Sequence, residues 1–217
     1  MTDAQIRAAT PPTIDRPGVE AVYLSHWHVP DARTGHAQLD RIAEAWRQAS
    51  WPDGILTFAA YLSYDHDTAL TYVQCSRPDV YRPFVHALPD ERARIEPVEY
   101  RLRQTVSLQA RTSPPEAVVA ASFDVDGAER QRRVITLVTE HLRSASAEQH
   151  AGLLASHFHA SLDGTRVINF AEWTSDEAHI AFLEGSMRHG ALRLATEMPG
   201  VRPIGFTRYH LYRSLNP

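Results

Sequence analysis

The sequence predicts an α+β fold built from two tandem βαββαβ units. Two observations support this prediction. Along the 217 residues, strand-like and helix-like segments follow the order β-α-β-β-α-β twice. The second pass also repeats the first at a spacing of 98 residues, so that a hairpin turn and a strand-to-helix corner coincide. A βαββαβ unit is ferredoxin-like and leaves one sheet face bare. We therefore expect the two units to pack sheet to sheet, as a fused pseudo-dimer.

Each predicted helix or strand of the first half follows from a pattern in the local sequence. Leu39, Ile42, Ala43 and Trp46 recur at helical spacing, which predicts an amphipathic helix that ends near Ser50. It follows a β-rich run over residues 19–29 that Pro30 ends. The remaining expected elements are strands over residues 55–64 and 69–75, a short helix over 78–86 and a strand from residue 98 to 102.

The second half repeats this order. A strand is expected over residues 117–125, and the helix after it places Val134, Leu137, Val138 and Leu142 on one face. The next two strands, over residues 152–161 and 166–173, enclose a tight turn at Asp163-Gly164. A helix from Ser175 to about residue 188 and a strand over residues 204–212 complete the unit.

The sequence also suggests where the domains begin and end. Residues 1–17 are polar and contain Pro11, Pro12 and Pro17, so we expect a loose N-terminal arm. We expect the first subdomain over residues 18–111 and the second over 116–217, with the boundary near the Arg111–Pro115 segment.

Composition excludes several classes of function. The net charge of −4 and the scattered arginines provide no surface for nucleic acid or for an anionic membrane. No apolar run approaches the roughly 20 residues that span a bilayer, and the N-terminus has no signal-peptide core, so a cytoplasmic protein is expected. Cys75 is the single cysteine, which excludes an internal disulfide. The absence of lysine excludes Schiff-base chemistry.

The strand-to-helix corner over residues 167–183 is the best functional candidate. Asn169 and Trp173 share a strand parity, so an amide and an indole N–H face the same surface. Thr174 and Glu177 are placed to cap the helix that follows. A buried amide without a partner costs about 1 to 3 kcal/mol, so a polar Asn in an apolar strand needs a partner or a ligand.

This corner resembles one in the antibiotic biosynthesis monooxygenases. The resemblance rests on Asn169 and Trp173 four residues apart, the Thr-Ser-Asp-Glu-Ala segment after them and Phe182-Leu183 on the helix, and it covers residues 115–214. It implies a dimeric α/β barrel. It also implies a cofactor-independent monooxygenase that oxidises an aromatic polyketide or an anthrone-like polycyclic phenol to a quinone with O2. Neither flavin, haem nor metal takes part in that reaction.

The resemblance also implies site residues. Asn169 and Trp173 would hold the oxygen-derived anion, His159 would move the proton and Arg193 would orient the phenolate. Substrate binding would involve Phe158, His157 and His179. Phe158 lacks the hydroxyl of the usual aromatic residue, and His179 replaces a phenol, so proton handling is redistributed among these groups.

The first half does not offer the same donors. Thr71 and Cys75 stand where Asn169 and Trp173 stand in the second half, and a thiol cannot replace an indole donor. We therefore expect one site per chain, in the second half.

Other interpretations remain open at this point. A non-catalytic polyketide binder or a cyclase-like protein would use the same pocket without consuming oxygen. A haem-degrading enzyme would ligate iron through a histidine such as His189, and a quinol oxidase of primary metabolism would act on other substrates.

The His157–His159 pair and the His26–His28 pair resemble half of a metal site, but neither has a carboxylate in register. Expected partners are a small aromatic substrate and O2, and the fold also allows a homodimer.

Overall fold

The computed structural model describes residues 10–90, 95–109 and 113–217, except for the side chains of residues 186–189 and 191. The first half contains β1 (Ala21–His28), α1 (Ala32–Gln48), β2 (Ile55–Ser63), β3 (Thr68–Cys75), the 3-10 helix η1 (Pro78–Val80), α2 (Tyr81–Ala87) and β4 (Val98–Ser107). The second half contains β5 (Ala117–Val125), α3 (Ala128–Ser144), β6 (Leu153–Ser161), β7 (Arg166–Trp173), α4 (Asp176–Leu183), α5 (Ser186–Thr196) and β8 (Val201–Leu215). None of the helices in these described ranges is long and apolar enough to cross a membrane.

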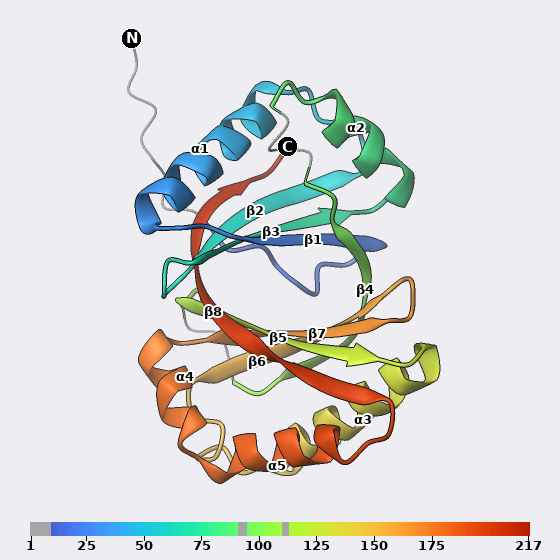
Figure 1. The fold of residues 1–217 in the computed structure, drawn as a ribbon, viewed down its shortest axis with the longest axis vertical. Helices are drawn as coiled ribbons and strands as arrows, with labels where there is room; N and C mark the ends of the chain where they lie inside the picture. Colours follow the sequence, from blue (N-terminus) through green and yellow to red (C-terminus); the bar gives the residue numbers. More distant parts are fainter. Residues whose placement is uncertain (1–9, 91–94, 110–112) are drawn as a thin grey trace.

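The strands close into one barrel in the order β1-β3-β2-β8-β5-β7-β6-β4 (Figure 1). Each half contributes a sheet with the same internal order, β4-β1-β3-β2 and β8-β5-β7-β6. The two sheets join where β2 pairs with β8 and where β4 pairs with β6. The helices of each half lie on the outside of its own sheet (Figure 1). This arrangement confirms the predicted fold, in which two ferredoxin-like units form a dimeric α/β barrel within one chain.

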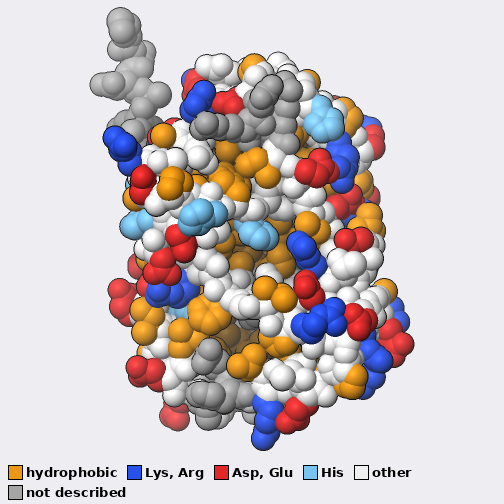
Figure 2. All heavy atoms as spheres, in the orientation of Figure 1, with side chains coloured by type: hydrophobic (Ala, Val, Ile, Leu, Met, Phe, Trp, Pro, Cys, Tyr) orange, Lys and Arg blue, Asp and Glu red, His pale blue; other side chains and the backbone are white. Residues whose placement is uncertain are grey.

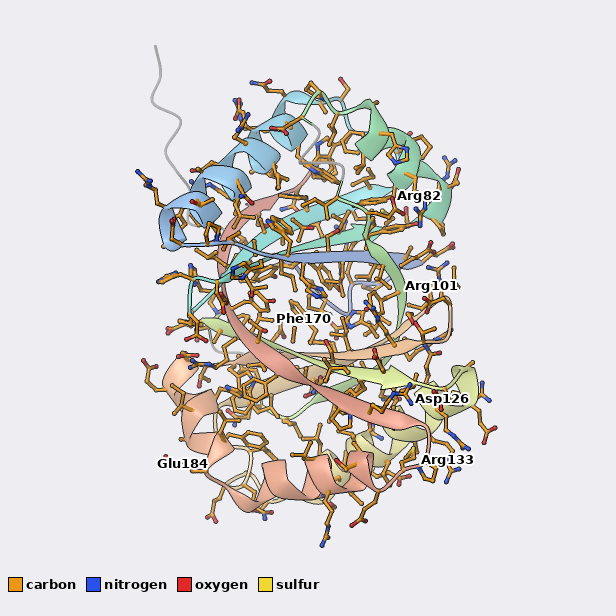
Figure 3. The ribbon with its side chains drawn as sticks, in the orientation of Figure 1. Arg82, Arg101, Asp126, Arg133, Phe170 and Glu184 are labelled. Atoms are coloured by element: carbon orange, nitrogen blue, oxygen red, sulfur yellow. The ribbon has the colours of Figure 1, made fainter. Side chains whose placement is uncertain are left out.

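The barrel interior contains an apolar cluster to which both sheets contribute. Phe170 of β7 lies near its middle (Figure 3), in ring contact with Tyr61 and Tyr72 of the first half. Val22, Leu24, Leu70, Val118 and Ile168 belong to the same buried cluster. The face that a single unit leaves bare is therefore covered by the other unit.

Residues 10–17 differ from the loose arm that the prolines predict. Ile14 is only 1% exposed and packs in the barrel interior. The side-chain amide of Gln74 holds this segment, since its nitrogen donates to the backbone oxygens of Thr13 and Ile14 at 3.0 and 3.1 Å. An apolar side chain between the prolines was the signal for this packing. Residues 1–9 of the expected arm, and Arg111 at the expected boundary, lie outside the described residues.

Two predicted elements of the second half have different bounds. The single helix expected from Ser175 to about residue 188 is two helices, because the chain is extended at Gly185 between α4 and α5. Its N-cap is Ser175, whose hydroxyl accepts from the amide of Ala178 at 3.2 Å, so Thr174 is not the cap. The last strand is also longer than the predicted range of residues 204–212, because β8 pairs with β5 at one end and with β2 at the other.

The two halves share their strand register in detail. In both, the second strand pairs with the third through the same sequence of partners and carries a β-bulge at the same place. Corresponding pairs are Ile55↔Cys75 with Leu153↔Trp173, Phe58↔Val73 with Ser156↔Ala171, and Ala60↔Thr71 with Phe158↔Asn169. Each side chain of one half can therefore be compared with its counterpart in the other.

Candidate functional site

A cavity of about 350 Å³ lies between the outer face of the second-half sheet and helices α3, α4 and α5. Its volume is at the lower end of the range for small-molecule sites. The walls are mostly apolar, and the polar side chains that line it are few: Ser122, Ser156, Asn169, His179 and the indole of Trp173. Such a cavity suits a flat apolar ligand that carries a small number of polar atoms.

Asn169 and Trp173 both line this cavity, and the small side chain of Ala171 lies between them on β7. Oδ1 of Asn169 and Nε1 of Trp173 are buried, and neither has a hydrogen-bond partner among the described residues. Buried tryptophan N–H groups usually have one, and leaving such a group unsatisfied costs about 1 to 3 kcal/mol. The two groups are therefore placed to bond something that enters the cavity.

The cavity exists because the second half has smaller side chains than the first at equivalent positions. Ser156 corresponds to Phe58, Ala171 to Val73 and Val119 to Tyr23. In the first half Phe58 stacks on Trp46 of α1 at 4.6 Å, and Tyr23 stacks on Tyr81 at 3.9 Å. The corresponding space there, next to Thr71, holds only about 10 Å³.

His179 lies between Trp173 inside the cavity and Phe206 at its entrance. It is a buried residue of α4, and its ring lies edge-on to Trp173 at 5.0 Å and to Phe206 of β8 at 5.3 Å. Phe206 is partly exposed, as are Leu192 and Ile204 on the same rim. Figure 2 shows apolar side chains at the surface in the lower half of this face, where β8 and α5 run in Figure 1. The entrance is therefore apolar.

His157 and His159 do not face this cavity. Directly paired residues on neighbouring strands point to the same side, and Phe158 is the partner of Asn169. The histidines on either side of Phe158 therefore point into the barrel interior. The predicted grouping of His159 with Asn169 and Trp173 is not what the structure shows. The reason is that the alternation along β6 was known from the sequence, whereas its register against β7 was not.

Inside the barrel the two histidines belong to a buried polar network. Nε2 of His157 lies 3.1 Å from the Glu172 carboxylate, and its Nδ1 lies 3.0 Å from the hydroxyl of Thr105. Nδ1 of His159 lies 3.1 Å from the backbone oxygen of His157, to which it donates as the neutral ring. Burial, with a smaller effect of the His157 charge, lowers the pKa of His159 to about 3. His159 is therefore neutral at ordinary pH.

Of the remaining predicted site residues, neither Phe158 nor Arg193 lines the cavity. Phe158 is fully buried beside the cavity and packs in the core under the helices, next to Asn169 in register. Arg193 is exposed on α5 and does not line the cavity. His189, the alternative haem ligand, lies in α5 with its side chain outside the described residues. No three His, Cys, Asp or Glu side chains in the described ranges are arranged to hold a metal ion.

Sequence reasoning missed Ser156, although a signal was present. At the spacing of 98 residues that aligns the two halves, Ser156 falls on Phe58, a change from a large aromatic to a hydroxyl. Such a change on a helix-facing strand position indicates space and a polar atom in the same place.

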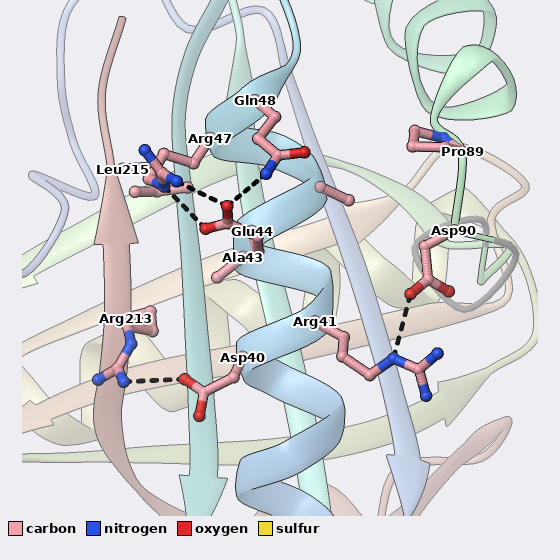
Figure 4. Close-up of a pocket in the computed structure, with 11 residues that line it drawn as sticks. Asp40, Arg41, Ala43, Glu44, Arg47, Gln48, Pro89, Asp90, Arg213 and Leu215 are labelled. Atoms are coloured by element: carbon pink, nitrogen blue, oxygen red, sulfur yellow. Dashed lines mark hydrogen bonds and ion pairs between the residues drawn. The ribbon is translucent and has the colours of Figure 1, made fainter.

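A second hollow lies on the surface between α1, the Pro89-Asp90 segment and the end of β8 (Figure 4). Its charged side chains pair with one another: Arg213 with Asp40 at 2.8 Å, Arg41 with Asp90 at 3.6 Å and Arg47 with Glu44 at 2.6 Å. These exposed pairs are solvated and already matched, so we place the candidate site in the second-half cavity instead.

No protein-family model matches the sequence, and no curated protein matches it either. Solved structures do match. An anthrone oxidase-like protein is 15% identical with a TM-score of 0.70, over 91% of this chain and 93% of that one. A monooxygenase-like protein from Listeria innocua is 11% identical with a TM-score of 0.54, over 90% of this chain and 95% of that one.

A third similar structure is a ferredoxin-fold protein from Listeria monocytogenes that is related to antibiotic biosynthesis monooxygenases. It is 12% identical with a TM-score of 0.52, over 90% of this chain and 96% of that one. At these identities the similarity concerns the fold. The chain has the fold of the antibiotic biosynthesis monooxygenase-like proteins, with both ferredoxin-like units in a single polypeptide.

Proposed function

We propose that the second-half cavity is the active site of a cofactor-independent monooxygenase. Its substrate would be an aromatic polyketide or another anthrone-like polycyclic phenol, which it would oxidise to a quinone with O2. The observation that carries the proposal is the pair of buried, unpartnered polar atoms on Asn169 and Trp173 in an otherwise apolar cavity. The monooxygenase-like proteins of the same fold support the reaction class.

The reaction balances without a further reductant. The methylene carbon of the anthrone loses a proton, and the resulting electron-rich carbanion passes one electron to O2. The two radicals combine to a peroxide, which takes up a proton and then loses water as the new carbonyl forms. Overall, one CH2 group and one O2 give one C=O group and one H2O.

The residues of the cavity have separate roles in this proposal. The Trp173 indole N–H and the Asn169 amide nitrogen donate to the phenolate or peroxide oxygen as negative charge develops there, and this effect is strong where water is excluded. The unpartnered Oδ1 of Asn169 accepts from a phenol hydroxyl of the substrate. His179 is the ionisable side chain that lines the cavity, so we assign proton transfer to it and not to His159. Leu192, Ile204 and Phe206 form the apolar entrance. The proposal gives Arg193 no role, because this residue is exposed and does not line the cavity.

Oxygen uptake tests the proposal directly. Purified protein, dialysed against a chelator and free of flavin, is mixed with 1,8-dihydroxyanthrone in air-saturated buffer. We expect uptake of one O2 per anthrone, well above the rate of spontaneous oxidation, and formation of 1,8-dihydroxyanthraquinone. The Asn169→Ala variant should slow uptake by about a hundredfold, which is typical for loss of one oxyanion donor. A wild-type rate equal to the rate without protein would contradict the proposal.

A further inference from the structure

Ser156 is a third polar group of the cavity. Its side chain lines the cavity, the residue is only 1% exposed, and its Oγ has no hydrogen-bond partner in the described part of the chain. On β6 it pairs directly with Ala171 of β7. It therefore lies beside the small residue that separates Asn169 from Trp173. The side chains of Ser156, Asn169 and Trp173 surround the same part of the cavity wall.

The chemistry of a hydroxyl group distinguishes Ser156 from the other two. A serine hydroxyl donates one hydrogen bond and accepts others, and it rotates to suit its partner. Two other buried serines on the barrel strands have a partner: the hydroxyl of Ser161 donates to Asp163 at 2.6 Å, and that of Ser63 donates to Asp67 at 3.0 Å. A buried serine without such a bond costs stability, so its presence needs an explanation.

The comparison between the halves gives a second reason. Phe58, the counterpart of Ser156, fills the equivalent space with a ring that stacks on Trp46. Ser156 therefore leaves a space at the sheet surface about as large as an aromatic ring, with a hydroxyl at its base. An aromatic ring that carries an oxygen fits both properties.

We infer that Ser156 is a specificity-determining residue that binds an oxygen substituent on one ring of the ligand. Its small size admits that ring, and its hydroxyl selects the oxygenated ring over an unsubstituted one. This inference rests on the proposed function for the identity of the cavity, but it concerns recognition and not oxidation.

Binding of two matched ligands tests it without any turnover. The first is 1,8-dihydroxyanthraquinone, and the second is anthracene, which has the same fused three-ring carbon skeleton and no oxygen. Affinities follow from the change in protein fluorescence. We expect Ser156→Ala to raise the Kd of the dihydroxyanthraquinone by about fivefold to tenfold, as for the loss of one hydrogen bond. The Kd of anthracene should not rise. Ser156→Phe should abolish binding of both ligands, because it restores the ring of the first half.

Thr139 provides a matched control. It is a buried residue of α3 whose hydroxyl also has no partner among the described residues, but it does not line the cavity. Thr139→Val should leave both Kd values unchanged. Equal effects of Ser156→Ala on the two ligands, no effect on either, or absence of binding by wild-type protein would each overturn the inference.

The outcome can be separated from that of the proposed function. If Ser156 distinguishes the two ligands but anthrone oxidation is not accelerated, the recognition site stands and the monooxygenase proposal fails. If oxidation is accelerated but Ser156→Ala does not alter the preference between the ligands, the role of Ser156 is wrong and the monooxygenase proposal stands.

Discussion

The hydroxyl of Tyr72 lies 3.1 Å from Nε2 of His159, so a side chain of the first half contacts one of the second half inside the barrel. Burial raises the pKa of Tyr72 well above its ordinary value, so the phenol keeps its proton. Its hydroxyl donates a hydrogen bond to Nε2 of the neutral imidazole. The other ring nitrogen of His159 donates to the backbone oxygen of His157. Both nitrogens of the neutral ring are therefore satisfied, and a charged ring would lose the bond from Tyr72.

This contact predicts an acid-sensitive fold. The pKa of His159 is about 3 in the folded chain against 6.5 for the free side chain, so below pH 6.5 the unfolded state binds the proton first. The contribution of His159 to the free energy of unfolding is fully present above pH 6.5. It is lost as the pH drops towards 3, by up to about 1.4 kcal/mol per pH unit. The free energy of unfolding of His159→Gln, measured with urea between pH 4 and 7, should depend less steeply on pH than that of the wild type. His86→Gln, at an exposed histidine, should keep the wild-type slope.

Two tryptophans allow a paired test of the unpartnered indole. Trp173 N–H has no partner among the described residues, whereas Trp51 N–H donates to the backbone oxygen of Trp46 at 2.7 Å. Trp173→Phe should preserve the free energy of unfolding or raise it by about 1 kcal/mol, while anthrone oxidation falls by about a hundredfold. Trp51→Phe should lower the free energy of unfolding by about 1 kcal/mol and leave the oxidation rate unchanged. The reverse pattern would show that Trp173 is an ordinary core residue.

The first half is filled with side chains where the second half has a cavity. Substitution by alanine at equivalent positions should therefore affect the free energy of unfolding differently in the two halves. Phe58→Ala removes a fully buried ring from a filled core and should cost about 3 to 5 kcal/mol. Ser156→Ala removes an unpartnered hydroxyl next to an existing cavity and should be neutral or slightly stabilising. Thermal and urea unfolding of both variants measure the difference. Similar losses in the two variants would contradict the account of how the cavity arises.

The packing of Ile14 predicts that the N-terminal segment contributes to stability. Ile14→Ala should lower the free energy of unfolding by about 2 to 4 kcal/mol, as for a buried aliphatic side chain. Ile180→Ala removes the same atoms from a residue that is 42% exposed and should change it by less than about 0.5 kcal/mol. An equally small loss in Ile14→Ala would mean that the segment leaves the barrel in solution.

The sequence predicted the fold, but only three of the seven predicted site residues line the candidate cavity, and the reasons for the difference are physical. Alternation along one strand correctly placed Asn169 and Trp173 on one face, because this property is local. The position of His159 depended on the register between β6 and β7, which is set by the whole sheet and cannot be read from either strand alone. Arg193 follows the break at Gly185 that the sequence did not predict, and it does not line the cavity. Ser156 could be recognised as a cavity residue only by comparing the two halves residue by residue.

The most direct measurement follows the indole N–H of Trp173 by NMR. In ¹⁵N-labelled protein the four tryptophans give separate indole signals, and Trp173→Phe assigns the one of interest. On addition of 1,8-dihydroxyanthraquinone, we predict a downfield shift of the Trp173 signal as its N–H gains an acceptor. The signals of Trp27 and Trp51, whose N–H groups already donate to Gln38 and to the Trp46 backbone, should not move. A ligand that binds without moving the Trp173 signal, or that moves the other two instead, would contradict the account.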